Sequence, residues 1–312
     1  MIQDQVGSSR PSVSKHTFFL DRTPSVSCPN VSVGQNNILG FQPKRQLGSG
    51  ARTTIHHVTD RSGRSYALKH LVLLSASDHR YLVQMRHEHS IARRLDFPGI
   101  RRTHRLKLKR RPFRVVEAGL VMDLIDGVAL DQADTSTLAR TVESFRQIGE
   151  ALASLHRLGW VHADVKPTNI VVSSDGAVLI DLGQAARVRT TKTRVQGTPG
   201  FMAPEQAYRD PITPRTDLYG FGATLYWSLT GRTVPTVINS RSSSRSLGSL
   251  ANLDQPALPP PVRNFRSDVP EELATLVDRC VAPNPTMRPG GMPEILGVLA
   301  RLKGEIMRAS DD

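Results

Sequence analysis

Hydrophobic and polar positions follow two different periods along the chain. Residues 41–69 contain short runs of alternating character that meet at a glycine pair and at a turn over residues 60–63, and this pattern predicts three β-strands. Residues 120–126 form a more continuous apolar run, which indicates a buried strand that leaves through Gly127, a natural hinge. We therefore expect a small sheet in the first half of the chain.

Helical spacing dominates the rest. One helix is predicted over residues 77–95, and a long amphipathic helix over residues 137–158. Residues 217–229 are apolar on every side, which predicts a buried helix. Two further helices are expected at about residues 270–282 and 292–302. The second half of the chain should therefore form a larger, mainly helical lobe.

Some stretches show neither period. Residues 1–38 are rich in Ser, Pro, Asn and Gln, so we expect a disordered or mobile tail. Residues 239–261 form a Ser-rich and then Pro-rich excursion without a clear core, and a polar tail is expected over residues 304–312. The predicted ordered domain, its N-terminal lobe and its C-terminal lobe are residues 39–303, 39–125 and 126–303.

Composition adds a strong positive charge. The 312 residues carry a formal net charge of +13, which favours acidic partners without naming them. Eight Lys or Arg and no acid lie between Arg101 and Arg114, and the alternation in this run predicts a strand with one basic, solvated face. Phe113 is the only aromatic residue nearby, so base stacking on nucleic acid is disfavoured.

Cysteine usage and hydropathy indicate the compartment in which the chain is expected to fold. The two cysteines, Cys28 and Cys280, lie in dissimilar contexts, so the sequence shows no disulfide framework or metal cluster and favours a reducing, cytoplasmic compartment. The sequence has no window of about 18 uninterrupted apolar residues, so we expect no membrane-spanning helix. The first residues also lack the apolar centre of a secretory signal.

The chemistry-bearing residues gather in the stretch VHADVKPTNI, residues 161–170. Phosphoryl transfer needs few protein groups, because its catalysis is mostly positioning and charge stabilisation. Asp164 can orient a hydroxyl and accept its proton, and Lys166 can neutralise charge on the moving phosphoryl group. Asn169 and Asp181, the latter at the end of an apolar strand, offer the oxygen ligands that Mg²⁺ prefers. The pattern predicts a phosphotransferase that uses ATP.

Upstream residues are suited to holding the nucleotide. Gly48 and Gly50 let backbone amides approach phosphates without a Cβ in the way, although a hairpin turn explains this pair about equally well. Lys69 lies on an otherwise apolar strand from which it can reach those phosphates, and Glu88 can form an ion pair with it. An exposed strand lysine and a solvated helix glutamate are the alternatives.

Together these residues resemble the eukaryotic-like (Hanks-type) serine/threonine protein kinase family over about residues 47–302. The resemblance implies an α+β, bilobal fold: a small N-lobe with an antiparallel β-sheet plus one helix, and a larger, mainly helical C-lobe. Any one motif is weak evidence, whereas the whole set in order is strong. The motifs are Gly48-x-Gly50, Ala67-Leu68-Lys69, Glu88, His162-Ala163-Asp164, Lys166, Asn169, Asp181-Leu182-Gly183, Ala203-Pro204-Glu205, Asp217 and Arg288.

The resemblance also implies roles. Asp164 and Lys166 are the expected catalytic residues, and Asn169 and Asp181 the expected ligands of Mg²⁺ or Mn²⁺. The residues expected around ATP, with Met122 as the gatekeeper and the hinge after it, are Leu47, Gly48, Gly50, Ile55, Ala67, Lys69, Glu88, Met122, Asp123, Ile125 and Val171.

Three further residues are implied as supports. Glu205 is expected to pair with Arg288, and Asp217 to accept hydrogen bonds from the backbone of the catalytic loop. Lys166 and Thr198 resemble the serine/threonine branch of the family.

Three departures from the family pattern stand out. Thr53 replaces the third glycine of the phosphate loop, so we expect a weaker grip on nucleotide. Leu182 replaces the usual Phe, one large apolar side chain for another. Ala163 stands where the family has an Arg that binds a phosphorylated activation-loop residue, so phosphorylation should matter less for activity here. The candidate phosphorylation sites and nearby cations are Thr190, Thr191, Thr193, Arg187, Arg189, Lys192 and Arg194.

These observations predict a serine/threonine protein kinase that acts on protein substrates, with acidic segments favoured by the net charge. The alternative is a nucleotide-binding pseudokinase or scaffold. Thr53 and the basic and Ser-rich segments point to that alternative, whereas the intact set of catalytic residues argues against it. The oligomeric state, the physiological substrate and the activating signal do not follow from the sequence.

Overall fold

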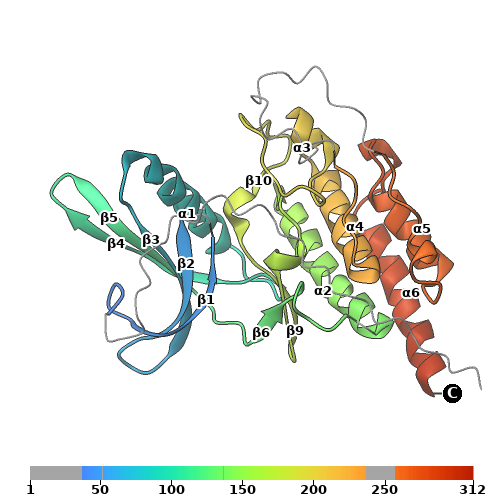
Figure 1. The fold of residues 1–312 in the computed structure, drawn as a ribbon, viewed down its shortest axis with the longest axis horizontal. Coiled ribbons are helices and arrows are strands. Elements are labelled where there is room, and N and C mark those ends of the chain that lie inside the picture. The colour runs from blue at the N-terminus through green and yellow to red at the C-terminus, as the bar shows by residue number, and fades with distance from the viewer. Residues whose placement is uncertain (1–36, 51, 136, 237–256, 312) are drawn as a thin grey trace, which may run out of the picture.

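The computed structural model describes residues 37–50, 52–135, 137–236 and 257–311 (Figure 1). The predicted tail lies outside these residues except for its last two positions, and so do Cys28 and most of the predicted excursion. Within the described segments, every helix is too short or too polar to span a bilayer.

The N-lobe is a five-stranded antiparallel sheet covered by one helix, α1 (His79–Ala92). Leu82 and Met85 of α1 are buried in one apolar cluster with Leu71 and Leu120 of the sheet. This packing carries α1 alongside the strands, as Figure 1 shows. In the spatial order β1-β2-β3-β5-β4, the strands are β1 (Gln42–Ser49), β2 (Thr53–Thr59), β3 (Ser65–Val72), β5 (Arg114–Met122) and β4 (Thr103–Arg111).

The C-lobe is mainly helical, as predicted. Phe145 of α2 and Phe221 of α4 meet edge to face in its core, with ring centroids 5.2 Å apart. Most side chains of α4 are buried, in agreement with the apolar run predicted for that helix. The helices are α2 (Leu138–Arg157), α3 (Pro204–Tyr208), α4 (Pro214–Thr230), α5 (Glu271–Cys280) and α6 (Met292–Asp311).

Short strands in the C-lobe place the chemistry-bearing loops. The stretch predicted to be catalytic begins at the end of β7 and runs into β8, and Asp181 comes two residues after β9. β6 pairs with β8, β8 with β9, and β7 with β10, all antiparallel. These strands are β6 (Gly127–Ala129), β7 (Trp160–Val161), β8 (Ile170–Ser173), β9 (Gly176–Leu179) and β10 (Ala186–Arg187).

The last helix is longer than the sequence pattern indicated. We expected a helix to about residue 302 and a polar tail from residue 304, but α6 continues to Asp311. Ile306 packs against the same apolar cluster as Leu299 and Leu302, so the buried stripe of the helix extends beyond the predicted end.

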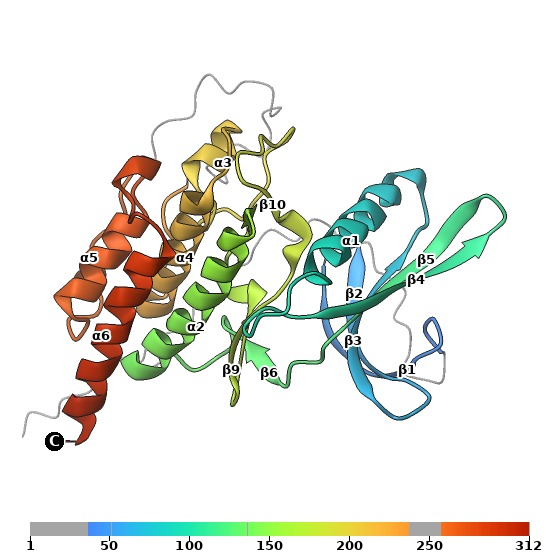
Figure 2. The same cartoon turned by 180° about the vertical axis from the view of Figure 1, so that it is seen from behind.

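The basic run at residues 101–114 divides into two parts. Most of it forms the β4–β5 hairpin, which extends away from the body of the molecule (Figures 1 and 2). Arg101 precedes β4 and is buried, with 9% of its surface exposed, so the prediction of a solvated side chain is wrong at this position. The backbone N–H of Arg101 donates to the carbonyl of Leu179 at 3.1 Å, which joins the segment before β4 to the end of β9.

Candidate active site

A buried lysine joins the two lobes. Lys69 on β3 has its Nζ 2.7 Å from Oε2 of Glu88 on α1 and 3.2 Å from Oδ1 of Asp181. The predicted Lys–Glu pair is therefore formed, and both side chains are buried rather than exposed. Burial by itself would lower the pKa of Lys69, but the two carboxylates outweigh it and raise that pKa above its usual value. Lys69 is thus a permanent cation at neutral pH.

Asp181 is held in a strained backbone conformation beside this lysine. Its φ is +65°, and its Oδ1 accepts the backbone N–H of Gly183 at 3.1 Å. A Cβ on Gly183 would lie 2.9 Å from that oxygen, which explains glycine at this position. Burial would raise the pKa of Asp181, yet Lys69 and the Gly183 amide lower it to about 2. The carboxylate is therefore ionised and suited to a divalent cation.

Three side chains fix the carboxylate of Asp164. Lys166 Nζ lies 2.9 Å from Asp164 Oδ2, and Thr198 donates its hydroxyl to Oδ1 at 3.1 Å. Asn169 donates from Nδ2 to the same carboxylate at 3.0 Å and to the Asp164 backbone carbonyl at 2.9 Å. Lys166 also donates to the Thr198 hydroxyl at 2.8 Å. The loop thereby presents one oriented carboxylate with a cation next to it.

Asp217 of α4 supports the backbone of the same loop. This side chain is 1% exposed and accepts the backbone N–H groups of His162 and Ala163, each at 2.8 Å, which confirms the predicted contact with the loop backbone. His156, near the end of α2, also bonds to Asp217 through Nε2 at 2.8 Å. A histidine near a helix C-terminus is common for electrostatic reasons, so nothing in the sequence marks His156 as a partner of Asp217.

Ala163 stands where the resemblance implies a phosphate-binding arginine, and a neutral side chain holds the backbone at this residue. Its φ is +62°, and its carbonyl accepts Nε2 of Gln206 at 2.9 Å. The same Nε2 donates to the carbonyl of Gln196 at 3.2 Å. Gln206, which the sequence analysis missed, therefore ties the catalytic loop to the segment before Thr198 with hydrogen bonds of neutral groups.

An ion pair anchors the loop that contains Gly48 and Gly50. Arg52, in the turn between β1 and β2, donates from two nitrogens to the carboxylate of Asp78 at 2.8 and 2.7 Å. Asp78 is buried and also accepts the backbone N–H groups of Leu74 and Ser75. This contact, which the sequence did not reveal, joins the loop to the turn that precedes α1. At Gly48, a Cβ would meet nothing within 4 Å, whereas at Gly50 it would lie 3.1 Å from the hydroxyl oxygen of Thr53, so the open part of the loop is at Gly48.

The predicted nucleotide residues lie on the N-lobe sheet, in the segment after β5 and on β8. Ile55 of β2 pairs with Lys69 of β3, and Ala67 of β3 pairs with Met122 of β5, so the sheet brings these four residues together. Met122 and Ala67 are buried, and Ile55 is half-buried. Of the other predicted residues, Leu47 lies on β1, Asp123 and Ile125 lie in the segment after β5, and Val171 lies on β8 of the C-lobe.

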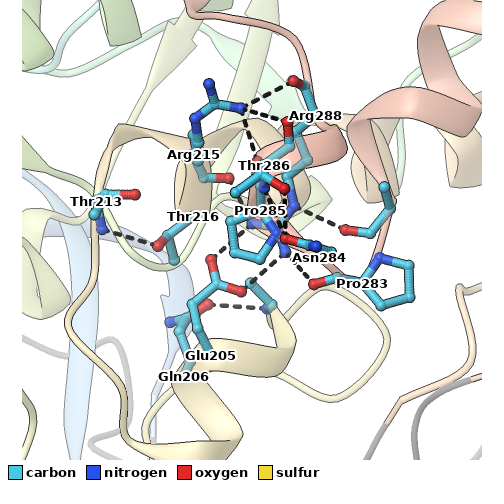
Figure 3. Close-up of polar contacts among 12 residues, drawn as sticks. Glu205, Gln206, Thr213, Arg215, Thr216, Pro283, Asn284, Pro285, Thr286 and Arg288 are labelled. Carbon is cyan, nitrogen blue, oxygen red and sulfur yellow. Dashed lines mark hydrogen bonds and ion pairs between the residues drawn. The ribbon is translucent and has the colours of Figure 1, made fainter.

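A second polar cluster supports the C-lobe, and Figure 3 shows it in detail. The Arg288 guanidinium forms two parallel bonds to the Glu205 carboxylate, at 2.7 and 2.9 Å, so the predicted pair is present. Arg288 is buried and donates its remaining N–H groups to backbone carbonyls, among them those of Arg215 and Pro283. Arg215 in turn donates to the carbonyls of Pro285 and Arg288. The cluster joins α3, the start of α4 and the turn before α6.

A lysine held by a helix glutamate, above a loop that presents a fixed aspartate, is the arrangement of a protein kinase. The chain belongs to that family, because the family model of the protein kinase domain matches residues 41–298. The expected fold class is thereby confirmed.

Curated relatives are serine/threonine-protein kinases. The chain is 29% identical to PknA of Mycobacterium tuberculosis over 258 residues, which cover 80% of this chain and 58% of that protein. It is 33% identical to PkaA of Streptomyces coelicolor over 270 residues, with 78% and 46% covered. Identity to PknB of Mycolicibacterium smegmatis is 31% over 254 residues, with 78% and 39% covered. The chain thus spans about half the length of these relatives.

Proposed function

We propose that this chain is an active serine/threonine protein kinase that transfers the γ-phosphoryl group of ATP to Ser or Thr hydroxyls of protein substrates. The observation that carries the proposal is the Asp164 carboxylate, which Lys166, Asn169 and Thr198 fix in one orientation. Such an arrangement serves a group that must meet an incoming hydroxyl at a set angle. The named serine/threonine kinases among the relatives support the same assignment.

In this proposal Asp164 orients the substrate hydroxyl and accepts its proton as the new bond to phosphorus forms. Lys166 lies next to that carboxylate and stabilises negative charge on the phosphoryl oxygens during transfer. Thr198 keeps both side chains in place through its hydroxyl. The pseudokinase alternative gains nothing from this geometry, because each of these groups is present and aligned.

Kinases of this family use ATP with Mg²⁺, and the residues present fit both. Asp181 is an ionised oxygen donor, and the Nδ2 of Asn169 is engaged by Asp164, so its Oδ1 is the atom offered to a cation. Lys69 supplies the fixed positive charge for phosphates, and the open backbone at Gly48 lets amides approach them. The metal, Mg²⁺ or Mn²⁺, supplies charge neutralisation on the transferred group.

A transfer assay tests the proposal. Purified protein is incubated with γ-labelled ATP, Mg²⁺ and either an acidic or a basic carrier protein, beside an Asp181→Asn variant that removes the charged metal ligand. We expect label on Ser and Thr of the carrier with wild type, and almost none with the variant. Nucleotide binding without any transfer by wild type would refute the kinase and support the pseudokinase.

Partners and setting are also proposals. With +13 net charge, the chain should favour protein substrates with acidic segments, so the acidic carrier is expected to be the better one. A cytoplasmic setting fits the two cysteines, of which Cys280 is free and buried among the described residues.

Activation-loop phosphorylation should contribute little to activity. Gln206 links Ala163 to Gln196, which follows the candidate phosphorylation sites in the chain, through neutral hydrogen bonds that need no phosphate. We expect the Thr190→Ala/Thr191→Ala/Thr193→Ala variant to retain at least about half of the wild-type turnover. Steady-state kinetics on one carrier measures this, and a loss of nearly all turnover contradicts it.

A further inference from the structure

The end of the β4–β5 hairpin is a projecting, strongly basic turn that the candidate active site does not use. The two strands are joined by Pro112 and Phe113, and the hairpin extends to the opposite end of the molecule from α5 and α6 (Figures 1 and 2). All five residues from Arg110 to Arg114 are exposed. We call this segment, residues 110–114, the hairpin tip.

Cations nearer the body of the molecule have partners within the fold. Lys107 donates from Nζ to the carbonyl of Leu39 at 2.8 Å, and Lys109 Nζ lies 3.1 Å from Oε2 of Glu117. Glu117 is the only acid in the sequence of the hairpin, and Nε2 of His70 also lies 2.9 Å from its carboxylate. A solvated basic face with local pairs therefore accounts for these positions.

The three arginines of the hairpin tip have no such partners. Among the residues that the structure describes, the side chains of Arg110, Arg111 and Arg114 form no hydrogen bond, ion pair or ring contact. Arg111 and Arg114 also lie directly opposite each other across the two strands, and like charges in that arrangement destabilise a hairpin. Folding therefore gains nothing from these charges, which concentrate a positive potential on one exposed point.

Phe113 breaks a second rule of hairpin design at the same place. Its side chain is fully exposed, and its φ of +63° lies in the left-handed region. Gly or Asn is usual at such a turn position, because a Cβ is strained there. Glycine would form the same turn without placing an apolar ring in water. Fold stability thus gives no reason for phenylalanine at the apex of the hairpin tip.

An apolar ring beside three cations fits a partner that is negatively charged at its surface and apolar just beneath it. An anionic lipid bilayer has both properties, because aromatic rings enter its interface and each Lys or Arg near the surface strengthens binding. A planar bilayer can also meet a projecting tip without enclosing it. A stable protein interface needs on the order of 1,000 Å² of buried surface, and single-stranded nucleic acid needs several stacking rings. The hairpin tip has five residues and one ring.

We propose that the hairpin tip is a peripheral membrane-binding element, in which Phe113 enters the interface of an anionic lipid bilayer and the three arginines bind the headgroup phosphates. Guanidinium groups suit this role because they pair with phosphate through two hydrogen bonds. The hairpin tip lies at one end of β5 and Met122 of the proposed nucleotide site at the other. The inference therefore does not rest on the proposed function, and the two can be tested apart.

Flotation of the full chain with lipid vesicles tests the proposal. Vesicles of phosphatidylcholine alone are compared with vesicles in which about one third of the lipid is phosphatidylglycerol. We expect wild type to bind the anionic vesicles at least about tenfold more tightly than the neutral ones, with an affinity that falls as the salt concentration rises.

Replacing the three arginines of the hairpin tip with Gln is expected to weaken binding to anionic vesicles by about a hundredfold, because three charges near the lipid surface are lost. The matched control also replaces three exposed arginines of the N-lobe with Gln, but on α1 or just after it: Arg86, Arg93 and Arg94. This control removes the same net charge and should weaken binding by less than about threefold, since its charges lie away from the hairpin tip.

Two variants of Phe113 separate membrane insertion from a role in folding. Phe113→Gly should bind anionic vesicles about tenfold more weakly, because the apolar ring is lost. Its melting temperature should equal or exceed that of wild type, since glycine suits the left-handed backbone. On anionic vesicles the new indole of Phe113→Trp should show a blue-shifted emission that spin-labelled lipid quenches, measured against the background of Trp160 and Trp227.

Several results would overturn the inference: no preference of wild type for anionic vesicles, an equal loss in the arginine control, or an indole that stays in water on bound vesicles. Polyglutamate and a single-stranded oligonucleotide are tested as alternative ligands. If either binds through the hairpin tip and vesicles do not, the partner is an acidic protein or a nucleic acid and the membrane proposal fails. Phosphate transfer without vesicles should be the same in wild type and all hairpin variants, so a failure of the kinase activity is seen separately.

Discussion

Replacing Asp164 with Asn is expected to lower the rate of phosphoryl transfer by about two to four orders of magnitude. An amide cannot accept the hydroxyl proton, so the main chemical contribution of the side chain is lost. The amide also disturbs the loop, because Oδ1 accepts from Thr198 while Oδ2 accepts from Asn169 and pairs with Lys166. An NH₂ in the Oδ2 position faces the donors of Asn169 and Lys166. Nucleotide affinity should stay near that of wild type, since Lys69 and Asp181 are untouched.

Single-turnover transfer of labelled phosphate, together with nucleotide titration, measures both quantities. Asp175→Asn is the matched control, because it makes the same change at an exposed turn between β8 and β9. The control should transfer phosphate at close to the wild-type rate. A rate above about a tenth of wild type for Asp164→Asn would show that another group accepts the proton.

The regular elements were largely predictable because their faces are buried against one partner. The pattern over residues 137–158 gave α2 within one residue at each end, since an amphipathic stripe and a following glycine define a helix well. The end of α6 was missed, because polar residues beyond Leu302 hid the continued stripe through Ile306. The predicted end of a helix was thus wrong where the helix packs against the core beyond the last residue of the clear apolar pattern.

The site residues were predictable where they lie on a strand or helix that the sequence pattern already predicts. Lys69 and Glu88 meet because a strand and a helix of defined geometry face each other, and sequence order is enough to expect it. Arg101, by contrast, is buried beside the bridge between Ile100 and Leu179, where Leu179 accepts the backbone N–H of Arg101 and donates its own to Gly99. That contact spans distant parts of the chain, so no local period could reveal it.

The supporting side chains were also hidden from the sequence. Gln206 follows Glu205 in a recognised motif, yet only the fold shows that its amide reaches the carbonyls of Ala163 and Gln196. Arg52 and Asp78 lie 26 positions apart in segments that look like ordinary turns. Polar residues of this kind have several plausible partners in any sequence, and tertiary structure selects one.

Truncating Arg288 to Ala is expected to destabilise the domain by about 3–5 kcal/mol, because it leaves the buried Glu205 carboxylate without its counter-charge. All five N–H groups of Arg288 donate: two to Glu205 and three to backbone carbonyls. Removing the guanidinium therefore takes a donor away from the carbonyls of Arg215, Ala282 and Pro283, in the cluster that Figure 3 shows. Arg288→Lys should recover only part of the loss, since an ammonium has three donors and no planar fork.

Thermal melts measure the effect, and for a domain of this size the loss corresponds to a fall in melting temperature of roughly 6–20 °C. The matched control is Arg301→Ala, which breaks an Arg–Glu pair with Glu272 whose side chains are 60% and 42% exposed. Exposed pairs contribute little, so this control should lose less than about 1 kcal/mol. If both variants melt at the same temperature, the Glu205–Arg288 pair does not hold the C-lobe together. Gln206, the neighbour of Glu205 in the chain, anchors the catalytic loop through the carbonyl of Ala163. The Arg288→Ala variant should therefore also lose transfer activity at temperatures below its melting point.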